Sequence, residues 1–379
     1  MDATLGRLFV RERSGWRHLD PLLILTTVAL SVYGLFMVYS ATQQTLELLG
    51  EPDPAFYLKK QLAFLMLGVI AMMVAAVFDY RLVKVYAPFL YAGVVFLLLL
   101  VLTPLGDETA GAQRWITIFG FQFQPSEVAK LAVVAMLAAY LSEIAGSIRL
   151  EHVWRAAAIA VGPMVLIFIQ PDVGTTMVFA AVLVALLVVQ GARLKHIGAL
   201  MIVALVSLVV AFQLGIVQDY QIARLTGFID PAADPLRAGY NKAQAEIAIG
   251  AGGLTGKGYL QGTQTNLDFV PEQHTDFVFT VVGEELGFLG AMLLLGLFAL
   301  LLWRGFRTAM LSKEPFGTLL AVGVTTMIAF QLFVNVGMTL GIMPITGIPL
   351  PFVSYGGTSL ITNFLGIGLL LNVHMRRFK

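Results

Sequence analysis

The chain has 379 residues, of which 58% are hydrophobic and 12% are charged, and its mean hydropathy is +0.84. Soluble domains are about 45–50% apolar and about 25% charged, so this composition excludes a soluble globular protein. The 24 basic and 23 acidic residues give a net charge of +1, which provides no bulk field to recruit nucleic acid. The absence of cysteine excludes disulfides, thiolate metal sites and cysteine nucleophiles. The sequence therefore predicts a polytopic membrane protein.

Ten apolar stretches predict ten transmembrane helices, because a helix needs about 20 mostly apolar residues to cross a bilayer. The fifth and sixth stretches are short, and residues 171–174 alone separate them. The predicted fold is an all-α integral membrane protein, a ten-helix bundle that forms one polytopic domain over residues 1–379. The predicted spans are 21–41, 59–79, 83–103, 127–146, 155–170, 175–191, 196–216, 277–303, 317–343 and 357–374.

Orientation in the membrane follows from the distribution of Lys and Arg, because cytoplasmic loops carry an excess of both. When the N-terminus is placed in the cytoplasm, 16 of the 24 basic residues fall on the inner side. The even number of spans then predicts that both termini are cytoplasmic. The inner basic residues are Arg7, Arg11, Arg13, Arg17, Arg81, Lys84, Arg149, Arg155, Arg193, Lys195, Arg304, Arg307, Lys313, Arg376, Arg377 and Lys379.

Three outer segments, 104–126, 217–276 and 344–356, stand out from the otherwise short connections. The 217–276 loop, between the seventh and eighth spans, is the longest polar stretch, and connections beyond about 12–15 residues are uncommon unless they are functional. We therefore expect a large structured extracytoplasmic loop there. Segment 344–356 carries repeated Pro and Gly, which exclude a regular helix and predict a re-entrant or tightly folded loop packed on protein.

Asp276 stands immediately before the apolar run of the eighth span, at the outer membrane edge. A partly desolvated carboxylate there suits a general base that takes a proton from a hydroxyl group. Asp is also a favoured N-cap residue, so the residues alone support the cap and base interpretations equally. Glu272 and His274 are further polar candidates nearby, and no spacing of His, Asp or Glu resembles a dedicated metal cage.

Glu127 and Lys130 lie three residues apart at the start of the fourth span, on one helical face, and could form an ion pair. Two interpretations stay open: a local ion pair at the interface, or part of a polar pocket with Arg114 and Trp115 from the preceding loop. The sequence around Ser126 predicts a helix start with Ser126 as the N-cap. Such a helix N-terminus, facing outward, would favour an anion.

Several other polar residues at membrane depth have two interpretations each. Glu284 and Glu285 lie within the eighth span and could form a proton relay, although hydrogen bonds to neighbouring helices are favoured. Asn335 and Asn363 are interpreted as interhelical hydrogen-bonding residues. The Gly-rich segment 250–258 superficially resembles a phosphate loop. It lies on the outer side and follows no strand–helix unit, so nucleotide binding is not expected.

Four segments resemble motifs of the SEDS family (shape, elongation, division and sporulation), the polytopic peptidoglycan glycosyltransferases of bacteria. Their order and the ten-span layout also match, so the resemblance covers nearly the whole chain. It favours the elongation branch over the division branch, because Thr346 stands where division members usually carry Lys, and because of Met338 and the 262–264 motif. The segments are 113–115 (Gln-Arg-Trp) with 123–130 (Phe-Gln-Pro-Ser-Glu-Val-Ala-Lys), 170–175 (Gln-Pro-Asp-Val-Gly-Thr), 262–264 (Gly-Thr-Gln) with 271–277 (Pro-Glu-Gln-His-Thr-Asp-Phe), and 347–357 (Gly-Ile-Pro-Leu-Pro-Phe-Val-Ser-Tyr-Gly-Gly).

The resemblance implies that Asp276 is the catalytic carboxylate, which favours the base over the cap. The implied reaction is polymerisation of lipid II, in which Asp276 deprotonates the attacking hydroxyl and undecaprenyl diphosphate leaves with inversion to a β-1,4 link. Arg114, Lys130 and Arg224 are the candidates for stabilising the diphosphate. A divalent cation, Mg²⁺ or Mn²⁺, could share that task, although the sequence identifies no metal ligands. The candidate substrate-binding residues are Arg114, Trp115, Glu127, Lys130, Gln221, Arg224 and His274.

The resemblance also implies partners and a location. The expected partner is a class B penicillin-binding protein with transpeptidase activity, together with other membrane proteins of the elongation complex. The expected location is the bacterial cytoplasmic membrane, with the active site on the extracytoplasmic side. Three alternatives stay open: a lipid II flippase, a division or sporulation paralogue with the same chemistry, and a non-catalytic scaffold of a wall-synthesis complex. A flippase would need charges along a path through the bilayer, whereas the charges here cluster at the outer face.

Overall fold

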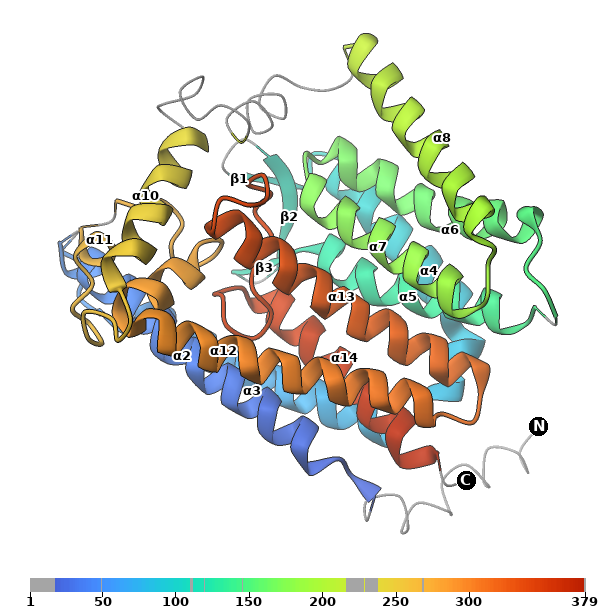
Figure 1. Cartoon of the computed structure of the whole chain (residues 1–379), viewed down its shortest axis with the longest axis horizontal. Helices are drawn as coiled ribbons and strands as arrows, with labels where there is room; N and C mark the ends of the chain where they lie inside the picture. The colour runs from blue at the N-terminus through green and yellow to red at the C-terminus, as the bar shows by residue number, and fades with distance from the viewer. Residues whose placement is uncertain are drawn as a thin grey trace.

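The computed structural model contains ten long helices arranged as a bundle, within the part of the chain that it describes (Figure 1). Nine of them are long and apolar enough to cross a membrane, and the tenth, Val173–Val189, is apolar but shorter. The predicted ten-helix fold is therefore confirmed. The helices are α2 (Pro21–Leu48), α3 (Phe56–Val77), α4 (Tyr80–Val101), α5 (Pro125–Ser142), α6 (Leu150–Ile169), α7 (Val173–Val189), α8 (Leu194–Gln213), α12 (Val278–Leu311), α13 (Pro315–Thr339) and α14 (Gly357–Arg376). The described residues are 18–48, 50–109, 112–118, 120–144, 146–215, 228, 238–267 and 269–377.

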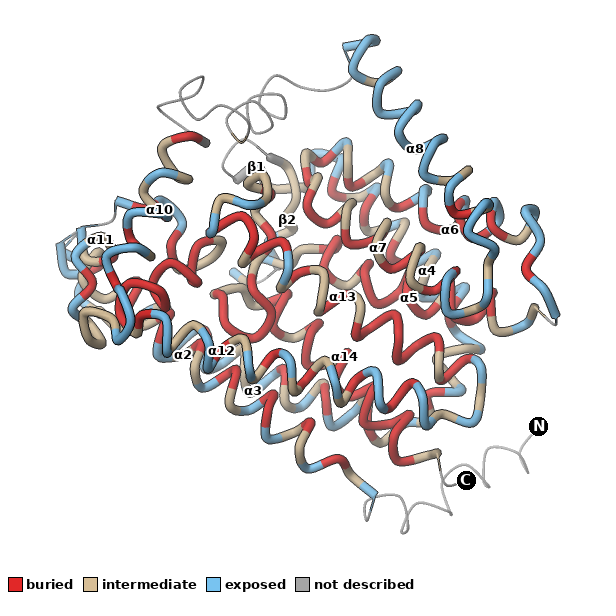
Figure 2. The backbone as a smooth tube through the Cα atoms, viewed as in Figure 1, coloured by how far each residue is buried: buried red, intermediate tan, exposed pale blue. Residues whose placement is uncertain are grey.

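Three helices, α5, α13 and α14, form the buried centre of the bundle (Figure 2). Their side chains are covered by protein on nearly all faces, so their apolar residues pack against one another rather than against lipid. Helix α8 is the opposite case, since it leans away from the bundle and is exposed along almost its whole length. An apolar helix with that exposure is compatible with a lipid environment.

A small antiparallel sheet interrupts the otherwise helical architecture, and the sequence did not predict it. It consists of β1 (Asp107–Thr109), β2 (Ala112–Ile118) and β3 (Phe121–Phe123), in the order β1-β2-β3. In the second pairing, Ile116 lies opposite Phe123, a β-branched residue beside an aromatic one, which is a favourable cross-strand pair. Strands β1 and β3 have only three residues each, and the seven residues of β2 show no clear alternation of apolar and polar side chains. Because β2 lies beside α5, the sheet holds residues 114 and 115 near the start of that helix.

The long loop between α8 and α12 is structured where the structure describes it. It contains α10 (Ala238–Gly252) and the short α11 (Thr263–Asn266), and α10 packs against α12. The prediction of a structured loop is confirmed for these residues. Segment 344–356 also behaves as predicted, because it is irregular yet buried, with Ile348, Leu350 and Val353 covered by protein.

Helix α12 is interrupted at Gly287, whose φ of +65° and ψ of −161° are not helical. An interruption removes hydrogen bonds between backbone groups four residues apart, and such groups cannot stay unpaired in a membrane. Here the loop after α10 replaces the lost hydrogen bonds. Its backbone N–H groups donate to two carbonyl groups before the break, and its carbonyl groups accept from two N–H groups after the break. The bonds run from Lys257 N to Glu284 O (3.0 Å), Gly258 N to Glu285 O (3.0 Å), Phe288 N to Gly253 O (2.9 Å) and Leu289 N to Leu254 O (3.1 Å).

This exchange explains the Gly-rich segment 250–258. A Cβ atom on Gly252 would lie 1.9 Å from the carbonyl oxygen of Gly283, and one on Gly256 would lie 2.1 Å from that of Glu285. Glycine is therefore required so that the loop backbone can approach the broken helix closely. The segment serves helix packing, which accounts for its composition without a nucleotide.

Gly256→Ala should lower the thermal unfolding midpoint of the purified protein clearly more than Gly253→Ala. Both glycines have positive φ values, +79° and +55°, at which alanine is strained by roughly 1–2 kcal/mol. Position 253 has open space for a Cβ atom, whereas position 256 adds the clash with backbone. Equal losses at the two positions, measured by thermal unfolding in detergent, would show that the close approach is not needed.

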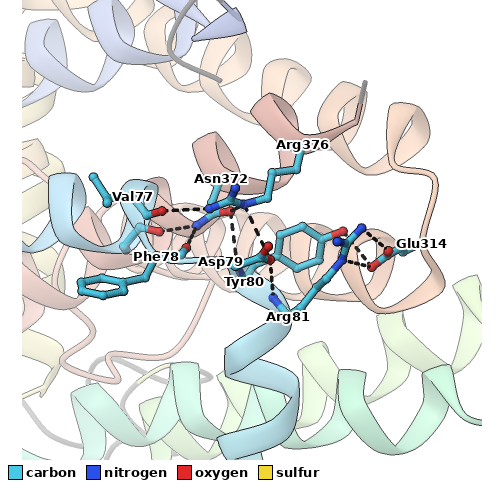
Figure 3. Close-up of polar contacts among 9 residues, drawn as sticks. Val77, Phe78, Asp79, Tyr80, Arg81, Glu314, Asn372 and Arg376 are labelled. Carbon is cyan, nitrogen blue, oxygen red and sulfur yellow. Dashed lines mark hydrogen bonds and ion pairs between the residues drawn. The ribbon is translucent and has the colours of Figure 1, made fainter. Parts of the chain in front are cut away.

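At one end of the bundle, the last turn of α14 holds the turn between α3 and α4 (Figure 3). Asn372 and Arg376 donate to carbonyl groups at the end of α3, and Arg376 Nε also donates to Asn372 Oδ1 (2.7 Å). Asp79 caps α4 by accepting from Arg81 N (3.0 Å). The carbonyl acceptors are those of Ala75 (2.6 Å), Val77 (2.8 Å) and Phe78.

A buried ion pair brings three helix ends together at this same end. The Asp20 carboxylate, before α2, accepts from Arg304 Nε (2.7 Å) near the end of α12. His374 in the last turn of α14 lies 3.8 Å from the same carboxylate oxygen. The start of the first helix and the end of the last one therefore lie on one side of the bundle, as an even number of spans requires.

Candidate active site

A polar cavity of about 340 Å³ lies beside the small sheet, and separate parts of the chain converge on it. Its lining includes five residues that the sequence predicted as candidates: Arg114, Trp115, Glu127, Glu272 and Asp276. These residues are far apart in the sequence, so the fold creates the site. The lining residues are Arg114, Trp115, Gln124, Glu127, Asp172, Thr175, Glu272, Thr275, Asp276, Gly347, Pro349, Tyr355, Gly356, Thr358 and Ser359.

Asp276 lies in the turn that leads into α12, and its backbone N–H donates to Glu272 O (3.0 Å). Glu272 has a φ of +55°, which lets the chain fold back on itself before the helix. The N-cap position of α12 is Phe277 rather than Asp276. The interpretation of Asp276 as the helix cap is therefore wrong, and its carboxylate is placed at the cavity instead.

The Asp276 carboxylate lies against the backbone of the Pro- and Gly-rich segment. A Cβ atom added to Gly347 would be 3.0 Å from Asp276 Oδ2, and Gly347 has a φ of +72°. The left-handed conformation and the absent side chain together allow the carboxylate to sit there. Segment 344–356 thus forms one wall of the cavity directly next to the acid.

Glu127 and Lys130 form an ion pair at the start of α5, with Lys130 Nζ 2.8 Å from Glu127 Oε1. Their side chains are 3% and 2% exposed, so the pair is desolvated and each charge depends on the other. Because Glu127 lines the cavity, the pair is part of the polar pocket as well as a local contact. The prediction that Ser126 caps α5 is wrong: Pro125 occupies the first helical position and Gln124 is the N-cap.

Arg114 joins the sheet to the turn between α6 and α7. Its Nε donates to Gln170 O (2.8 Å), and its Nη2 donates to Pro171 O. Gln170 Nε2 also fixes this turn, because it donates to Leu98 O (2.8 Å). Backbone carbonyls orient the guanidinium without neutralising its charge, so Arg114 brings a full positive charge to the cavity wall.

Two further carboxylates line the cavity and have local structural partners. Asp172 caps α7 by accepting from Thr175 N (3.0 Å) and Thr175 Oγ1 (2.9 Å). Glu272 accepts from Thr275 Oγ1 (3.0 Å) within the turn before Asp276. Both turns belong to the motif segments 170–175 and 271–277, but the sequence alone indicated no site role for Asp172, Thr175 or Thr275. The sequence signal that could have indicated a site role was a polar residue directly before a predicted helix.

His274 packs in an aromatic cluster with Tyr57 and Tyr355, and Tyr355 lines the cavity. The ring centroids of His274 are 4.9 Å from Tyr57 and 5.7 Å from Tyr355, and Tyr355 N donates to His274 O (2.9 Å). Burial lowers the pKa of His274, while the nearby Glu272 carboxylate acts in the opposite direction. Burial also raises the pKa of Tyr355 to about 12. Both rings are therefore neutral at pH 7.

The lowered pKa of His274 predicts a stability loss in mild acid. The unfolded chain takes up a proton on this imidazole below its ordinary pKa of 6.5, and the folded protein resists that proton. The contribution to stability is thus complete above pH 6.5 and is lost as the pH falls toward the folded-state pKa. The unfolding midpoint of wild type should fall between pH 7.5 and 5.5 more steeply than that of His274→Gln. Identical slopes would contradict this prediction.

Glu284 and Glu285 hold the large loop rather than lining the cavity. Glu284 is buried and receives Lys257 Nζ (2.8 Å) and the backbone N–H groups of α11 at Gln264 and Thr265 (both 2.9 Å). Glu285 accepts from Ser40 Oγ (2.5 Å) on α2. Hydrogen bonding to neighbouring elements, the favoured interpretation, is therefore confirmed for both carboxylates.

Gln221 and Arg224 lie outside the described residues, so their roles in substrate binding stay predictions. The lining residues that the sequence did not indicate lie far from Asp276 in the chain, except Thr275, and become its neighbours only through long-range packing. They are Gln124, Asp172, Thr175, Thr275, Gly347, Pro349, Tyr355, Gly356, Thr358 and Ser359.

Comparison with protein families gives one match across nearly the whole chain. A family described as "Cell cycle protein" and labelled FtsW, RodA and SpoVE matches residues 21–379. The peptidoglycan glycosyltransferase MrdB of Escherichia coli K12 is 37% identical over 360 residues, which is 95% of this chain and 94% of MrdB. Stage V sporulation protein E of Bacillus subtilis is 40% identical over 358 residues, 93% of this chain and 96% of that protein.

Solved structures agree with the sequence relatives. One similar chain belongs to the structure described as "Structural coordination of polymerization and crosslinking by a peptidoglycan synthase complex", with a TM-score of 0.81 and 33% identity. The match covers 95% of this chain and 99% of that chain. The rod shape determining protein RodA of Thermus thermophilus gives a TM-score of 0.70 and 31% identity, covering 95% and 98%.

Proposed function

This chain belongs to the SEDS family of FtsW, RodA and SpoVE proteins, and from that premise we propose that it is a peptidoglycan glycosyltransferase that polymerises lipid II during cell elongation. The observation that carries the proposal is the convergence of Asp276, Arg114 and the Glu127–Lys130 pair on one polar cavity. Glycosyl transfer from a lipid diphosphate needs a base for the acceptor hydroxyl and positive charge for the leaving group. The cavity has both.

In the proposed reaction, the 4-hydroxyl of a GlcNAc residue on incoming lipid II loses its proton to the Asp276 carboxylate. The oxygen attacks the anomeric carbon of the terminal MurNAc in the growing chain. The bond from that carbon to the diphosphate breaks, and undecaprenyl diphosphate leaves with the bonding electrons. Inversion at the carbon converts the α-linked diphosphate into a β-1,4 link.

Arg114 is the described cation best placed for the leaving diphosphate, because it lines the cavity and backbone carbonyls already orient it. Lys130 would act through Glu127, since the ion pair fixes both side chains. Arg224 is the third candidate and lies outside the described residues. Charge builds on the diphosphate as the bond breaks, so preorganised cations stabilise the transition state more than the ground state.

A divalent cation, Mg²⁺ or Mn²⁺, fits this chemistry as a companion of the diphosphate. The described part of the chain contains no group of three or more His, Asp or Glu side chains that could hold a metal ion. If such a cation assists the reaction, the cavity carboxylates are the residues that would hold it, and it would neutralise charge on the leaving diphosphate.

We place both termini in the cytoplasm and the cavity on the outer side. The excess of Lys and Arg at one side supports this orientation. The Asp20–Arg304 ion pair lies at the end where the first helix starts and the last helix ends, which is the end rich in Arg. The relatives and the apolar helices make the protein an integral protein of the bacterial inner membrane.

The proposed partner is a class B penicillin-binding protein, a transpeptidase that crosslinks the glycan made here, along with other membrane proteins of the elongation complex. Support comes from the similar chain that belongs to a synthase complex for polymerisation and crosslinking. The outer loops and the exposed flank of α12 and α13 are the surfaces that we expect to contact it.

Purified lipid II tests the proposed function directly. The detergent-solubilised chain, alone and with its partner, should convert lipid II into a ladder of glycan products that a muramidase digests. The absence of any polymer from well-folded protein under both conditions would refute the glycosyltransferase proposal.

A further inference from the structure

We infer that Asn335 is a positioning residue for the glycosyl transfer, because its amide bridges the two chain segments that hold the Asp276 carboxylate in place. This inference rests on the proposed function, in which Asp276 is the base. Asn335 touches the backbone of the site rather than the substrate, so its effect would pass through Asp276.

The bridge consists of two hydrogen bonds from one nitrogen atom. Asn335 Nδ2, on α13, donates to Asp276 O (2.8 Å) and to Ile348 O (2.8 Å). Asp276 belongs to the turn before α12, and Ile348 belongs to the irregular segment 344–356. Asn335 itself is completely buried, so its amide has no water to compete for these bonds. The two N–H groups of a primary amide match the two carbonyls.

The first bond restrains the backbone of Asp276, the proposed base. The N–H of Asp276 donates to Glu272 O (3.0 Å), and its carbonyl accepts from Asn335. These two bonds hold the peptide planes on both sides of the Asp276 Cα atom. The carboxylate can therefore change position only by rotation of the side chain. A general base must stay within hydrogen-bond reach of the proton that it takes, so this restraint bears on the rate.

The second bond fixes the surface against which the carboxylate lies. Ile348 follows Gly347, and a Cβ atom on Gly347 would be 3.0 Å from Asp276 Oδ2. By holding the Ile348 carbonyl, Asn335 sets how closely the Gly347 backbone approaches that oxygen. The same amide therefore restrains both the backbone that carries the Asp276 carboxylate and the Gly347 backbone against which that carboxylate lies.

Asn363 provides a matched control, because the two residues have the same side chain and the same burial. Asn363 is 1% exposed on α14, and its Nδ2 donates to Ser359 O (2.9 Å) within its own helix. Each residue has an Oδ1 atom that is buried with no hydrogen-bond partner among the described residues. The two asparagines thus differ in what the amide connects: Asn335 links two loops of the site, whereas Asn363 bonds within its own helix to Ser359, which lines the cavity. The predicted interhelical role is therefore wrong for Asn363.

Asn335→Leu and Asn363→Leu separate positioning from stability. Each change removes a buried amide, and we expect comparable decreases in unfolding midpoint for the two variants. Asn335→Leu should lower kcat for lipid II polymerisation about 100-fold with little change in KM, since a displacement of about 1 Å has that effect on a positioned group. Asn363→Leu should keep kcat within about threefold of wild type, measured per folded molecule.

Asn335→Thr and Gly347→Ala complete the test. The Thr hydroxyl can serve one carbonyl at a time, so kcat should lie between those of wild type and Asn335→Leu, and this variant is available if Asn335→Leu does not fold. Gly347→Ala displaces the carboxylate from the other side. Its combination with Asn335→Leu should lose less than the product of the two single losses, because both disturb one contact.

The outcomes distinguish this inference from the function on which it rests. If wild type makes no polymer, the proposed function fails and the inference fails with it. If wild type polymerises lipid II while Asn335→Leu keeps its kcat, or Asn363→Leu loses as much, the inference is wrong and the function stands. A rise in KM without a change in kcat would also overturn it, since that result indicates lost substrate binding rather than lost positioning.

Discussion

Replacing Asp276 with Asn should reduce glycan polymerisation to background while the protein stays folded. Asn has nearly the same size and keeps the backbone contacts of Asp276, but it cannot accept the proton of the attacking hydroxyl. General base catalysis contributes about 10²–10⁴-fold, so the loss should be at least of that order. The measurement is the initial rate of lipid II consumption per folded molecule, with the unfolding midpoint recorded for the same samples.

Glu272→Gln is the control for this result. Glu272 lines the same cavity four residues earlier and accepts a hydrogen bond from Thr275 Oγ1 (3.0 Å). Its replacement removes one cavity charge without removing the proposed base, so we expect a far smaller decrease in rate. An Asp276→Asn variant that keeps about a tenth of the wild-type rate or more would show that the base lies elsewhere.

Replacing Lys130 with Met should destabilise the protein strongly. The change leaves the Glu127 carboxylate buried without its cation, and breaking a buried pair in this way costs about 3–5 kcal/mol. Denaturant or thermal unfolding of purified variants measures the effect. The double variant Glu127→Gln/Lys130→Met should recover much of the stability because it removes both charges. It should not recover polymerisation, because Glu127 lines the cavity.

The exposed pair Glu151–Arg155 on α6 is the matched control for Lys130→Met. It joins the same kinds of charges at i,i+4 spacing, but its side chains are 60% and 63% exposed. Exposed pairs contribute about 0.2–1 kcal/mol, so Arg155→Met should hardly change the unfolding midpoint. Equal losses for Lys130→Met and Arg155→Met would contradict the view that desolvation makes the Glu127–Lys130 pair essential.

The helical part of the fold could be predicted because apolar length alone specifies a spanning helix. Ten apolar stretches became ten helices, and the Pro- and Gly-rich segment 344–356 became a buried irregular loop. The sheet at 107–123 was missed because two of its strands have only three residues and the third, Ala112–Ile118, shows no clear alternation of apolar and polar residues. The break at Gly287 was missed because a run of apolar residues hides it, and only the returning loop 253–258 makes it tolerable.

The catalytic candidate was accessible from sequence for a different reason. Asp276 belongs to a long motif, and the residues alone left its cap and base roles undecided. The structure assigns the N-cap of α12 to Phe277, and the base role stays a prediction. Asn335 illustrates the limit, because nothing local separates it from Asn363. Its importance arises from the distances to Asp276 and Ile348, which depend on how α13 packs against two distant loops.

Proteoliposomes that contain labelled lipid II test the central claim most directly, because polymer formation and transbilayer movement of lipid II can be followed in the same sample. Wild type should form glycan polymer, Asp276→Asn should form none, and lipid II should cross the bilayer at the protein-free rate in both. Accelerated movement of lipid II without polymer would contradict the account and would make this chain a transporter rather than a glycosyltransferase.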